Sequence, residues 1–118
     1  MTCIKTLSEH TAWIRVVNFN KDGSLFASGS DDNTVKLWNS ETFECLMTLS
    51  GHTSWIFSLC FSLDSKILAS GSWDYTVKVW DLEKQTEMKT LTGFRGIPQD
   101  ALFTSDGKLL IIGDYDCI

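Results

Sequence analysis

Residues 51–81 read GHTSWIFSLCFSLDSKILASGSWDYTVKVWD, and short runs of alternating apolar and polar side chains in them are separated by polar turns. This period of two is typical of β-strands, whereas no stripe of helical period appears. A Gly-His pair opens the segment, Ser70-Gly71-Ser72 lies in its middle and Trp80-Asp81 ends it. The segment therefore predicts a unit of short antiparallel strands with fixed residues at its turns.

The same unit occurs a second time along the chain. The stretch LSGHT at 49–53 answers LSEHT at 7–11, an offset of 42 residues. Between 3–44 and 45–86, 20 of 42 pairs are identical, whereas composition alone would give about two or three. A third copy is diverged and short. We predict 1–8 as the outer strand of a preceding unit, 9–50 as repeat one, 51–92 as repeat two and 93–118 as a truncated repeat three.

Four short strands are predicted in each complete unit, which gives one four-stranded antiparallel blade per repeat. The fold class expected is all-β, with two full blades and partial ones. The predicted strands are 14–20, 24–30, 34–38 and 44–49 in repeat one; 56–62, 66–72, 76–80 and 86–91 in repeat two; 2–7 before them; and 98–103 and 108–113 after them.

These spaced motifs resemble the WD-repeat β-propeller family over nearly the whole chain. The second unit carries Gly51-His52, Ser70-Gly71-Ser72 and Trp80-Asp81. The first unit departs from the family pattern at two places, since Glu9 replaces the usual Gly and Asn39 the usual Asp. The resemblance implies a β-propeller segment of four-stranded antiparallel blades.

The resemblance also implies a buried hydrogen-bonded chain of four side chains in each blade, with a structural role. Tryptophan only donates, serine and neutral histidine donate and accept, and a carboxylate only accepts, so the four can be satisfied in sequence. Either Ser28 or Ser30, and either Ser70 or Ser72, fits, because both members of a pair lie on one strand face. The expected members are His10, Ser28, Asp32 and Trp38, and His52, Ser70, Asp74 and Trp80.

The third unit lacks most of these residues. Phe94 stands at the position of His and Ile112 at the position of Ser, so only Asp116 of the four remains. That blade is not expected to form the network, and apolar packing is expected to replace it.

The recurring polar residues have two chemical alternatives to a structural role, a nucleophilic triad and a metal site. Ser, His and Asp at fixed spacing are the residue types of a nucleophilic triad, but no Gly-x-Ser-x-Gly elbow is present and the serine falls inside a strand. We therefore predict that the chain is not an enzyme. Asp22, Asp64 and Asp106 recur at one turn, where a single carboxylate per unit is too few for a hard cation. No metal and no cofactor are predicted.

The positions that vary between repeats predict a partner-binding patch. In the WD-repeat family, the start of the first strand and the residue before the turn aspartate line one rim of the propeller face. Large aromatic side chains there favour interface hot spots. A core position for Trp13 and Trp55 is the alternative, since both units keep them. The candidates are Trp13, Arg15 and Asp31; Trp55, Phe57 and Trp73; and Ile97, Gln99 and Tyr115.

Composition narrows the partners further. The net charge of −5 and the scattered Lys and Arg argue against a nucleic-acid ligand. The sequence contains no long apolar run, which argues against a membrane partner. Four widely spaced cysteines without a CxxC pair predict reduced thiols in the cytoplasm, with the nucleus as the alternative. A propeller needs more blades, so self-association or a longer parent chain is needed to close a ring.

We expect a protein-interaction scaffold that binds protein or peptide partners. The alternatives are a truncated non-binding remnant and a regulatory segment of a larger multidomain enzyme.

Overall fold

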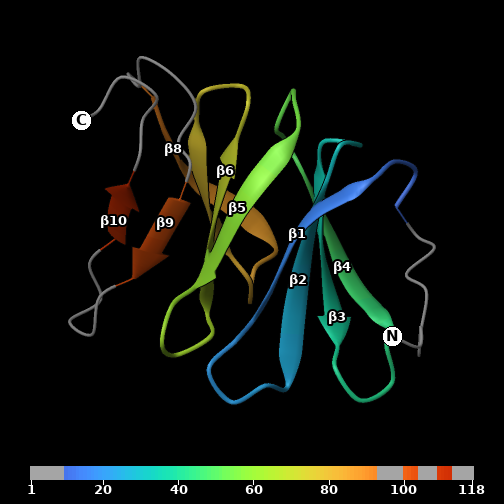
Figure 1. The fold of residues 1–118 in the computed structure, drawn as a ribbon. Helices are drawn as coiled ribbons and strands as arrows, with labels where there is room; N and C mark the ends of the chain where they lie inside the picture. Colours follow the sequence, from blue (N-terminus) through green and yellow to red (C-terminus); the bar gives the residue numbers. More distant parts are fainter. Residues whose placement is uncertain (1–9, 93–99, 104–108, 113–118) are drawn as a thin grey trace.

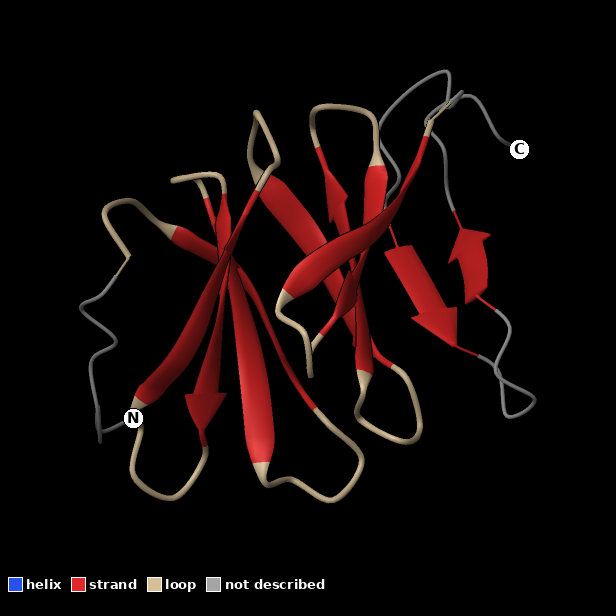
Figure 2. Ribbon diagram, turned by 180° about the vertical axis from the view of Figure 1, so that it is seen from behind, coloured by secondary structure: helices blue, strands red, loops and turns tan. Residues whose placement is uncertain are grey.

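The computed structural model describes residues 10–92, 100–103 and 109–112, the last two ranges by their backbone. Every regular element in these ranges is a β-strand, as Figure 2 shows. The strands form three antiparallel sheets that follow one another along the chain (Figure 1). No helix in the described ranges is long and apolar enough to cross a membrane. The predicted all-β fold class is confirmed.

Two of the sheets are complete four-stranded blades in which sequential strands are neighbours. All eight of their strands lie within one residue, at each end, of the predicted ranges. Blade one contains β1 (Ile14–Phe19), β2 (Leu25–Ser30), β3 (Thr34–Asn39) and β4 (Cys45–Ser50); blade two contains β5 (Ile56–Phe61), β6 (Ile67–Ser72), β7 (Val77–Asp81) and β8 (Thr86–Leu91).

The third sheet pairs β9 (Asp100–Phe103) with β10 (Leu109–Ile112). It corresponds to the first two strands predicted for the diverged third unit. The predicted outer strand at 2–7 lies outside the described residues. The described chain thus holds two full blades and part of a third, which do not close into a ring (Figure 1).

Each full blade has a β-bulge at the same place in its first strand. The pairing of β1 with β2 shifts between Ile14 and Val16, so that Arg15 is the extra residue. In β5 the shift falls between Ile56 and Ser58, which makes Phe57 the extra residue. Because a bulge bends the strand and redirects a side chain, the two bulges set how these residues are presented.

The main core lies where blade two packs against blade one. Ile56 and Leu59 of β5 are buried there. A Cβ placed on Gly29 of β2 would come within 2.5 Å of the Ile56 Cγ2 methyl, so only glycine allows the two sheets to approach this closely. The Asn18 side chain adds a polar link, since its amide donates to the Leu59 carbonyl at 2.8 Å.

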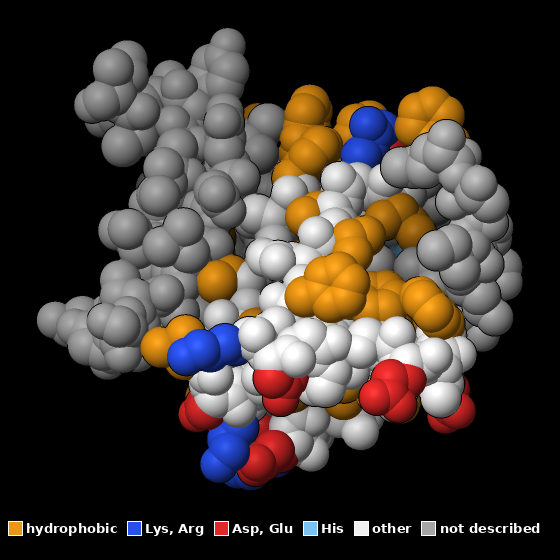
Figure 3. Space-filling model, turned by 60° about the horizontal axis from the view of Figure 1, so that its bottom comes forward, with side chains coloured by type: hydrophobic (Ala, Val, Ile, Leu, Met, Phe, Trp, Pro, Cys, Tyr) orange, Lys and Arg blue, Asp and Glu red, His pale blue; other side chains and the backbone are white. Residues whose placement is uncertain are grey.

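The other face of blade one is open. Val17 and Phe19 are 46% and 55% exposed, whereas their equivalents in blade two, Leu59 and Phe61, are 2% and 8% exposed. The difference has a simple cause, because blade one covers blade two and no described sheet covers blade one. Figure 3 shows apolar side chains uncovered on one face of the molecule, with charged side chains along its lower edge.

Candidate functional site

The four predicted side chains of blade one form a continuous hydrogen-bonded chain. The Trp38 indole Nε1–H donates to Ser28 Oγ at 2.8 Å, and Ser28 Oγ lies 2.6 Å from His10 Nε2. The other ring nitrogen, His10 Nδ1, lies 2.9 Å from Asp32 Oδ2. With the proton of the neutral imidazole on Nδ1, each group donates to the next and the chain ends on a carboxylate.

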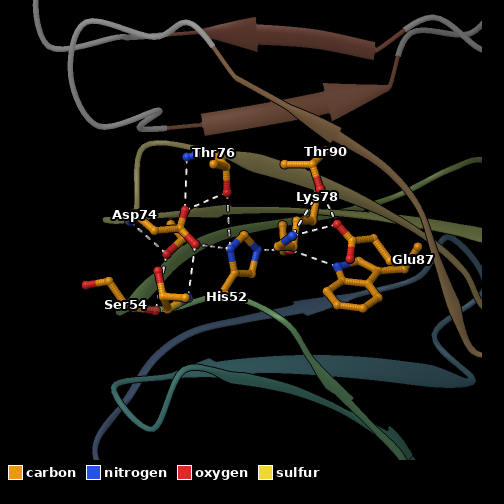
Figure 4. Close-up of polar contacts among 11 residues, drawn as sticks. His52, Ser54, Asp74, Thr76, Lys78, Glu87 and Thr90 are labelled. Carbon is orange, nitrogen blue, oxygen red and sulfur yellow. Dashed lines mark hydrogen bonds and ion pairs between the residues drawn. The ribbon is translucent and has the colours of Figure 1, made fainter.

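Blade two repeats this geometry (Figure 4). Trp80 Nε1–H donates to Ser70 Oγ at 2.8 Å, Ser70 Oγ lies 2.7 Å from His52 Nε2, and His52 Nδ1 lies 2.9 Å from Asp74 Oδ2. His52 and Ser70 are buried. The two chains therefore match bond for bond although β1 and β5 differ in their bulge residue.

The neighbouring lysine distinguishes the two blades. In blade two Lys78 Nζ lies 2.5 Å from Glu87 Oε1 and 3.0 Å from Thr90 Oγ1 (Figure 4). In blade one the position of Glu87 is taken by Cys45, and Lys36 Nζ donates to Thr48 Oγ1 at 2.8 Å. Blade two thus carries an ion pair at a place where blade one has a cysteine side chain.

The structure distinguishes the two serines of each strand. Ser28 is the one in contact with both histidine and tryptophan. Ser30 instead donates to the Ala12 carbonyl at 3.2 Å and accepts the backbone N–H of Asp32 at 3.1 Å. The first serine joins the side-chain chain, and the second ties the turn after its strand to the segment before β1. Ser70 and Ser72 repeat this division.

Hydrogen bonds hold the turn aspartates ionised. Burial disfavours the Asp32 carboxylate, but hydrogen bonds from Thr34, His10 and the Thr11 backbone outweigh burial and lower its pKa to about 2. The pKa of Asp74 is lowered in the same way. For His52, burial lowers the pKa below its usual value, against the opposing effect of Asp74. A neutral imidazole beside a carboxylate is the state that the donor-to-acceptor chain requires.

The geometry of Ser70, His52 and Asp74 is that of a nucleophilic triad, yet its surroundings are not. The serine side chain is completely buried, and its oxygen already accepts the Trp80 N–H. A nucleophile must be reachable by a substrate and lie beside oxyanion donors. Ser28 is equally buried. In both blades the arrangement therefore holds strands together and leaves no room for an acyl substrate.

The second set of recurring aspartates, in the turn between the first two strands of each blade, caps the backbone there. Asp22 Oδ1 accepts from the Ser24 N–H at 2.9 Å, and Asp64 Oδ1 accepts from the Lys66 N–H at 3.0 Å. Their pKa values are lowered by hydrogen bonds, from Ser24 and Ser62 first. Asp106 lies outside the described residues. Within the described ranges, no three His, Cys, Asp or Glu side chains gather as a metal site requires.

The predicted rim residues of both blades lie together at one end of the sheets. Backbone hydrogen bonds fix them in pairs: the Asp31 N–H donates to the Trp13 carbonyl, and the Trp73 N–H to the Trp55 carbonyl, each at 2.8 Å. The two bulge residues complete the set. We call these six residues the rim surface: Trp13, Arg15, Asp31, Trp55, Phe57 and Trp73. Ile97, Gln99 and Tyr115, the other predicted members, lie outside the residues whose side chains are described.

Aromatic rings make up the blade-two part of the rim surface. The Trp73 ring centroid lies 5.3 Å from both the Trp55 and the Phe57 centroid. Trp55 is 39% and Trp73 44% exposed, and Trp13 of blade one is 74% exposed. A core position for Trp13 and Trp55 does not hold in this structure. The rings of Trp55, Phe57 and Trp73 form one aromatic cluster, in which both indoles are exposed.

Arg15 joins the two blades at the rim surface. Its Nε and Nη2 donate to the two Asp31 carboxylate oxygens, both at 2.8 Å. The same guanidinium lies 5.3 Å from the Trp13 ring centroid and 5.1 Å from that of Trp55. This cation is therefore held by a bidentate ion pair and two indole rings. Sequence reasoning did not find the bulge that places Arg15 here, because a one-residue shift in pairing leaves no mark in the alternation of side chains.

Both repeats of the chain match one known protein family. The family model "WD40: WD domain, G-beta repeat" matches residues 1–39 and 43–81. The chain belongs to the WD40-repeat family. The two matched segments begin 42 residues apart (43 minus 1), as the internal repeat does. WD40 propellers are generally non-catalytic folds that mediate protein interactions.

Individual relatives match over single repeats. Protein Mut11 of Chlamydomonas reinhardtii is 52% identical over 40 residues, which are 34% of this chain and 11% of that protein. The Lissencephaly-1 homolog of Caenorhabditis briggsae is 46% identical over 37 residues, 31% of this chain and 10% of that protein. The matched part of the chain thus spans about a tenth of the length of these relatives.

Solved WD40 structures match most of the chain. The Cps50 (Swd1) β-propeller domain of Myceliophteria thermophila has a TM-score of 0.74 at 31% identity, with 80% of this chain and 28% of that chain covered. The structure of U3-55K has a TM-score of 0.78 at 25% identity, with 84% of this chain and 32% of that chain covered. The two blades therefore have the arrangement of a segment of a propeller.

Proposed function

We propose that this WD40 chain is a non-catalytic scaffold that binds protein or peptide partners through the rim surface. The observation that carries the proposal is the set of exposed indoles at one end of the blades: Trp13 and Trp55 lie against Arg15, and Trp73 lies against Trp55. Neighbouring exposed aromatic side chains cost solvation free energy in a free monomer and supply most of the binding energy in interfaces.

The rigidity of the rim surface favours it over the exposed apolar side chains of the outer strands. Its backbone is held by the Asp31–Trp13 and Trp73–Trp55 hydrogen bonds, so a partner meets a rigid surface and little conformational entropy is lost. By contrast, Leu46 and Met88 are single exposed side chains on the outer strands β4 and β8.

Trp73→Ala tests the proposal, with Met88→Ala as the matched control on β8. Tagged wild-type chain and both variants are incubated with lysate of the organism that encodes the chain, and captured proteins are quantified by mass spectrometry. We expect Trp73→Ala to reduce recovery of specific partners by about tenfold or more, and Met88→Ala to leave it unchanged. Equal recovery with all three proteins would refute the role of the rim surface.

The alternatives make different predictions. A truncated non-binding remnant would show no cooperative unfolding transition, and a regulatory segment of a larger multidomain enzyme would capture or belong to a chain with a catalytic domain. We further propose a cytoplasmic location, with the nucleus as the alternative, from the wide spacing of the four cysteines.

A further inference from the structure

Arg15 has a hydrogen-bonding edge that Asp31 does not use. A guanidinium carries five N–H donors in a planar fork, and the carboxylate of Asp31 takes one on Nε and one on Nη2. Within the described part of the chain no acceptor lies on Nη1 or on the remaining N–H of Nη2. The outward edge of Arg15 is therefore open to the oxygen atoms of a ligand.

Arg15 lines a shallow groove at the junction of the two blades. The groove has a volume of about 520 Å³, is open to solvent, and is lined by Thr11, Ala12, Trp13, Arg15, Asp31 and Trp55. The Arg15 guanidinium lies 5.3 and 5.1 Å from the two indole centroids and is tethered to Asp31, so it is already oriented before a ligand binds.

The hydrogen-bonding groups of the groove favour a ligand that accepts. Besides the open edge of Arg15, the indoles of Trp13 and Trp55 carry N–H donors and no acceptor. Asp31 is the one carboxylate in the lining, and both its oxygens are taken by Arg15. Because the Asp31 charge is already paired with a guanidinium, a cationic ligand gains less from it than from an unpaired carboxylate, whereas a ligand carboxylate can bind the open N–H groups without breaking that pair.

We propose that the groove binds an acidic side chain of a partner peptide. The carboxylate of the Asp or Glu accepts two N–H bonds on the outward edge of Arg15. A bulky apolar side chain next to it packs on Trp55, whose ring lies beside the guanidinium, and on Phe57 and Trp73, whose rings lie beside Trp55. This inference rests on the proposed binding role of the rim surface and adds the chemistry of the partner segment.

The test uses the complete 118-residue chain and two fluorescently labelled peptides, acetylated and amidated at their ends. One peptide carries glutamate beside leucine, and the other has glutamine in place of the glutamate. Fluorescence anisotropy gives each Kd. We expect the glutamate peptide to bind about tenfold tighter or more, since charge-assisted hydrogen bonds are lost with glutamine. Higher salt should reduce this difference.

Two variants assign the difference to Arg15. Arg15→Gln should remove the preference for glutamate, whereas Lys66→Gln makes the same charge change in the β5–β6 turn and should preserve it. Near-UV circular dichroism checks that Arg15→Gln is folded. If that variant loses its fold, the glutamate and glutamine pair on the unaltered chain still decides the question.

The outcomes separate this inference from the proposed function. Equal affinity for the two peptides, both weakened by Trp73→Ala, would overturn the carboxylate site and leave the rim surface as a binding surface. Absence of binding by both peptides would also overturn it, and the capture experiment with Trp73→Ala would then decide the proposed function alone. A glutamate preference that survives Arg15→Gln would assign the site elsewhere.

Discussion

Trp80 stabilises blade two in two ways: its ring is buried in the core, and its N–H group forms a buried hydrogen bond. The indole is 2% exposed and its Nε1–H donates to Ser70 Oγ at 2.8 Å. In Trp80→Phe the buried serine oxygen loses its donor and the smaller ring leaves a cavity, while Ser70 still bonds His52. We expect the free energy of unfolding to fall by about 2 kcal/mol, measured by urea denaturation.

The matched control is Trp73→Phe, the same change at an exposed position, for which we expect less than about 0.5 kcal/mol. Equal midpoints for Trp80→Phe and the wild type would show that the hydrogen-bonded chain of blade two contributes nothing to stability.

His52 and the network aspartates give stability a defined dependence on pH. The folded pKa of His52 is lowered, so between that value and the unfolded value of about 6.5 the unfolded chain binds more protons and acid favours unfolding. For Asp32 the folded pKa of about 2 lies below the unfolded value of about 3.9, so its contribution is lost as pH falls through that interval.

Urea midpoints measured at successive pH values should therefore be level above pH of about 7. They should fall first as His52 titrates and again as the aspartates do. A midpoint that rises on acidification below about pH 6.5 would contradict a neutral buried imidazole.

At the scale of the strand, the sequence predicts what depends on local alternation and misses what depends on pairing. The eight blade strands follow from apolar periodicity and turn residues, and the resemblance to the WD-repeat family implies the partners of His10 and His52. The choice between Ser28 and Ser30 needs the structure, because both face the same side of β2 and only their distances to His10 and Ala12 separate them.

The bulges are the second thing that alternation does not reveal. Arg15 and Phe57 are the extra residues in β1 and β5, and the bulge brings the Arg15 guanidinium to Asp31 and between Trp13 and Trp55. Gly29 shows the converse case: the sequence marks it as part of a repeated motif, but the reason for a glycine there is Ile56 of the next blade, whose Cγ2 methyl would lie only 2.5 Å from an added Cβ. Contacts between two sheets cannot be predicted from the alternation of side chains within one strand.

For the whole molecule, the main feature is that blade two has a buried first strand, whereas the first strand of blade one is exposed. Blade one supplies the surface that covers β5, and its own equivalent surface remains open at Val17 and Phe19. In a closed propeller each blade packs against a neighbour on both of its faces. The open face of blade one therefore carries apolar side chains of the kind found between blades, although here they are exposed to solvent. Self-association of the chain, or a longer parent chain, would cover it.

One pair of equivalent phenylalanines measures whether that face is open in solution. Phe61 is 8% exposed in the core between the blades, and Phe19, at the same register position in blade one, is 55% exposed. Phe61→Ala should cost about 3 to 5 kcal/mol because it leaves a cavity under blade one. Phe19→Ala should cost about 1 kcal/mol, since more than half of its surface is already exposed and less apolar area is lost from the core.

Both variants are denatured with urea at several protein concentrations, and light scattering gives the mass of the native chain under the same conditions. A monomer with the expected difference means that the β1 face of blade one is open and that the equivalent face of β5 is covered by blade one. Equal losses for the two substitutions, together with a midpoint that rises with protein concentration, would contradict the open face: a second copy would then bury Phe19 as blade one buries Phe61, because only association makes stability depend on concentration.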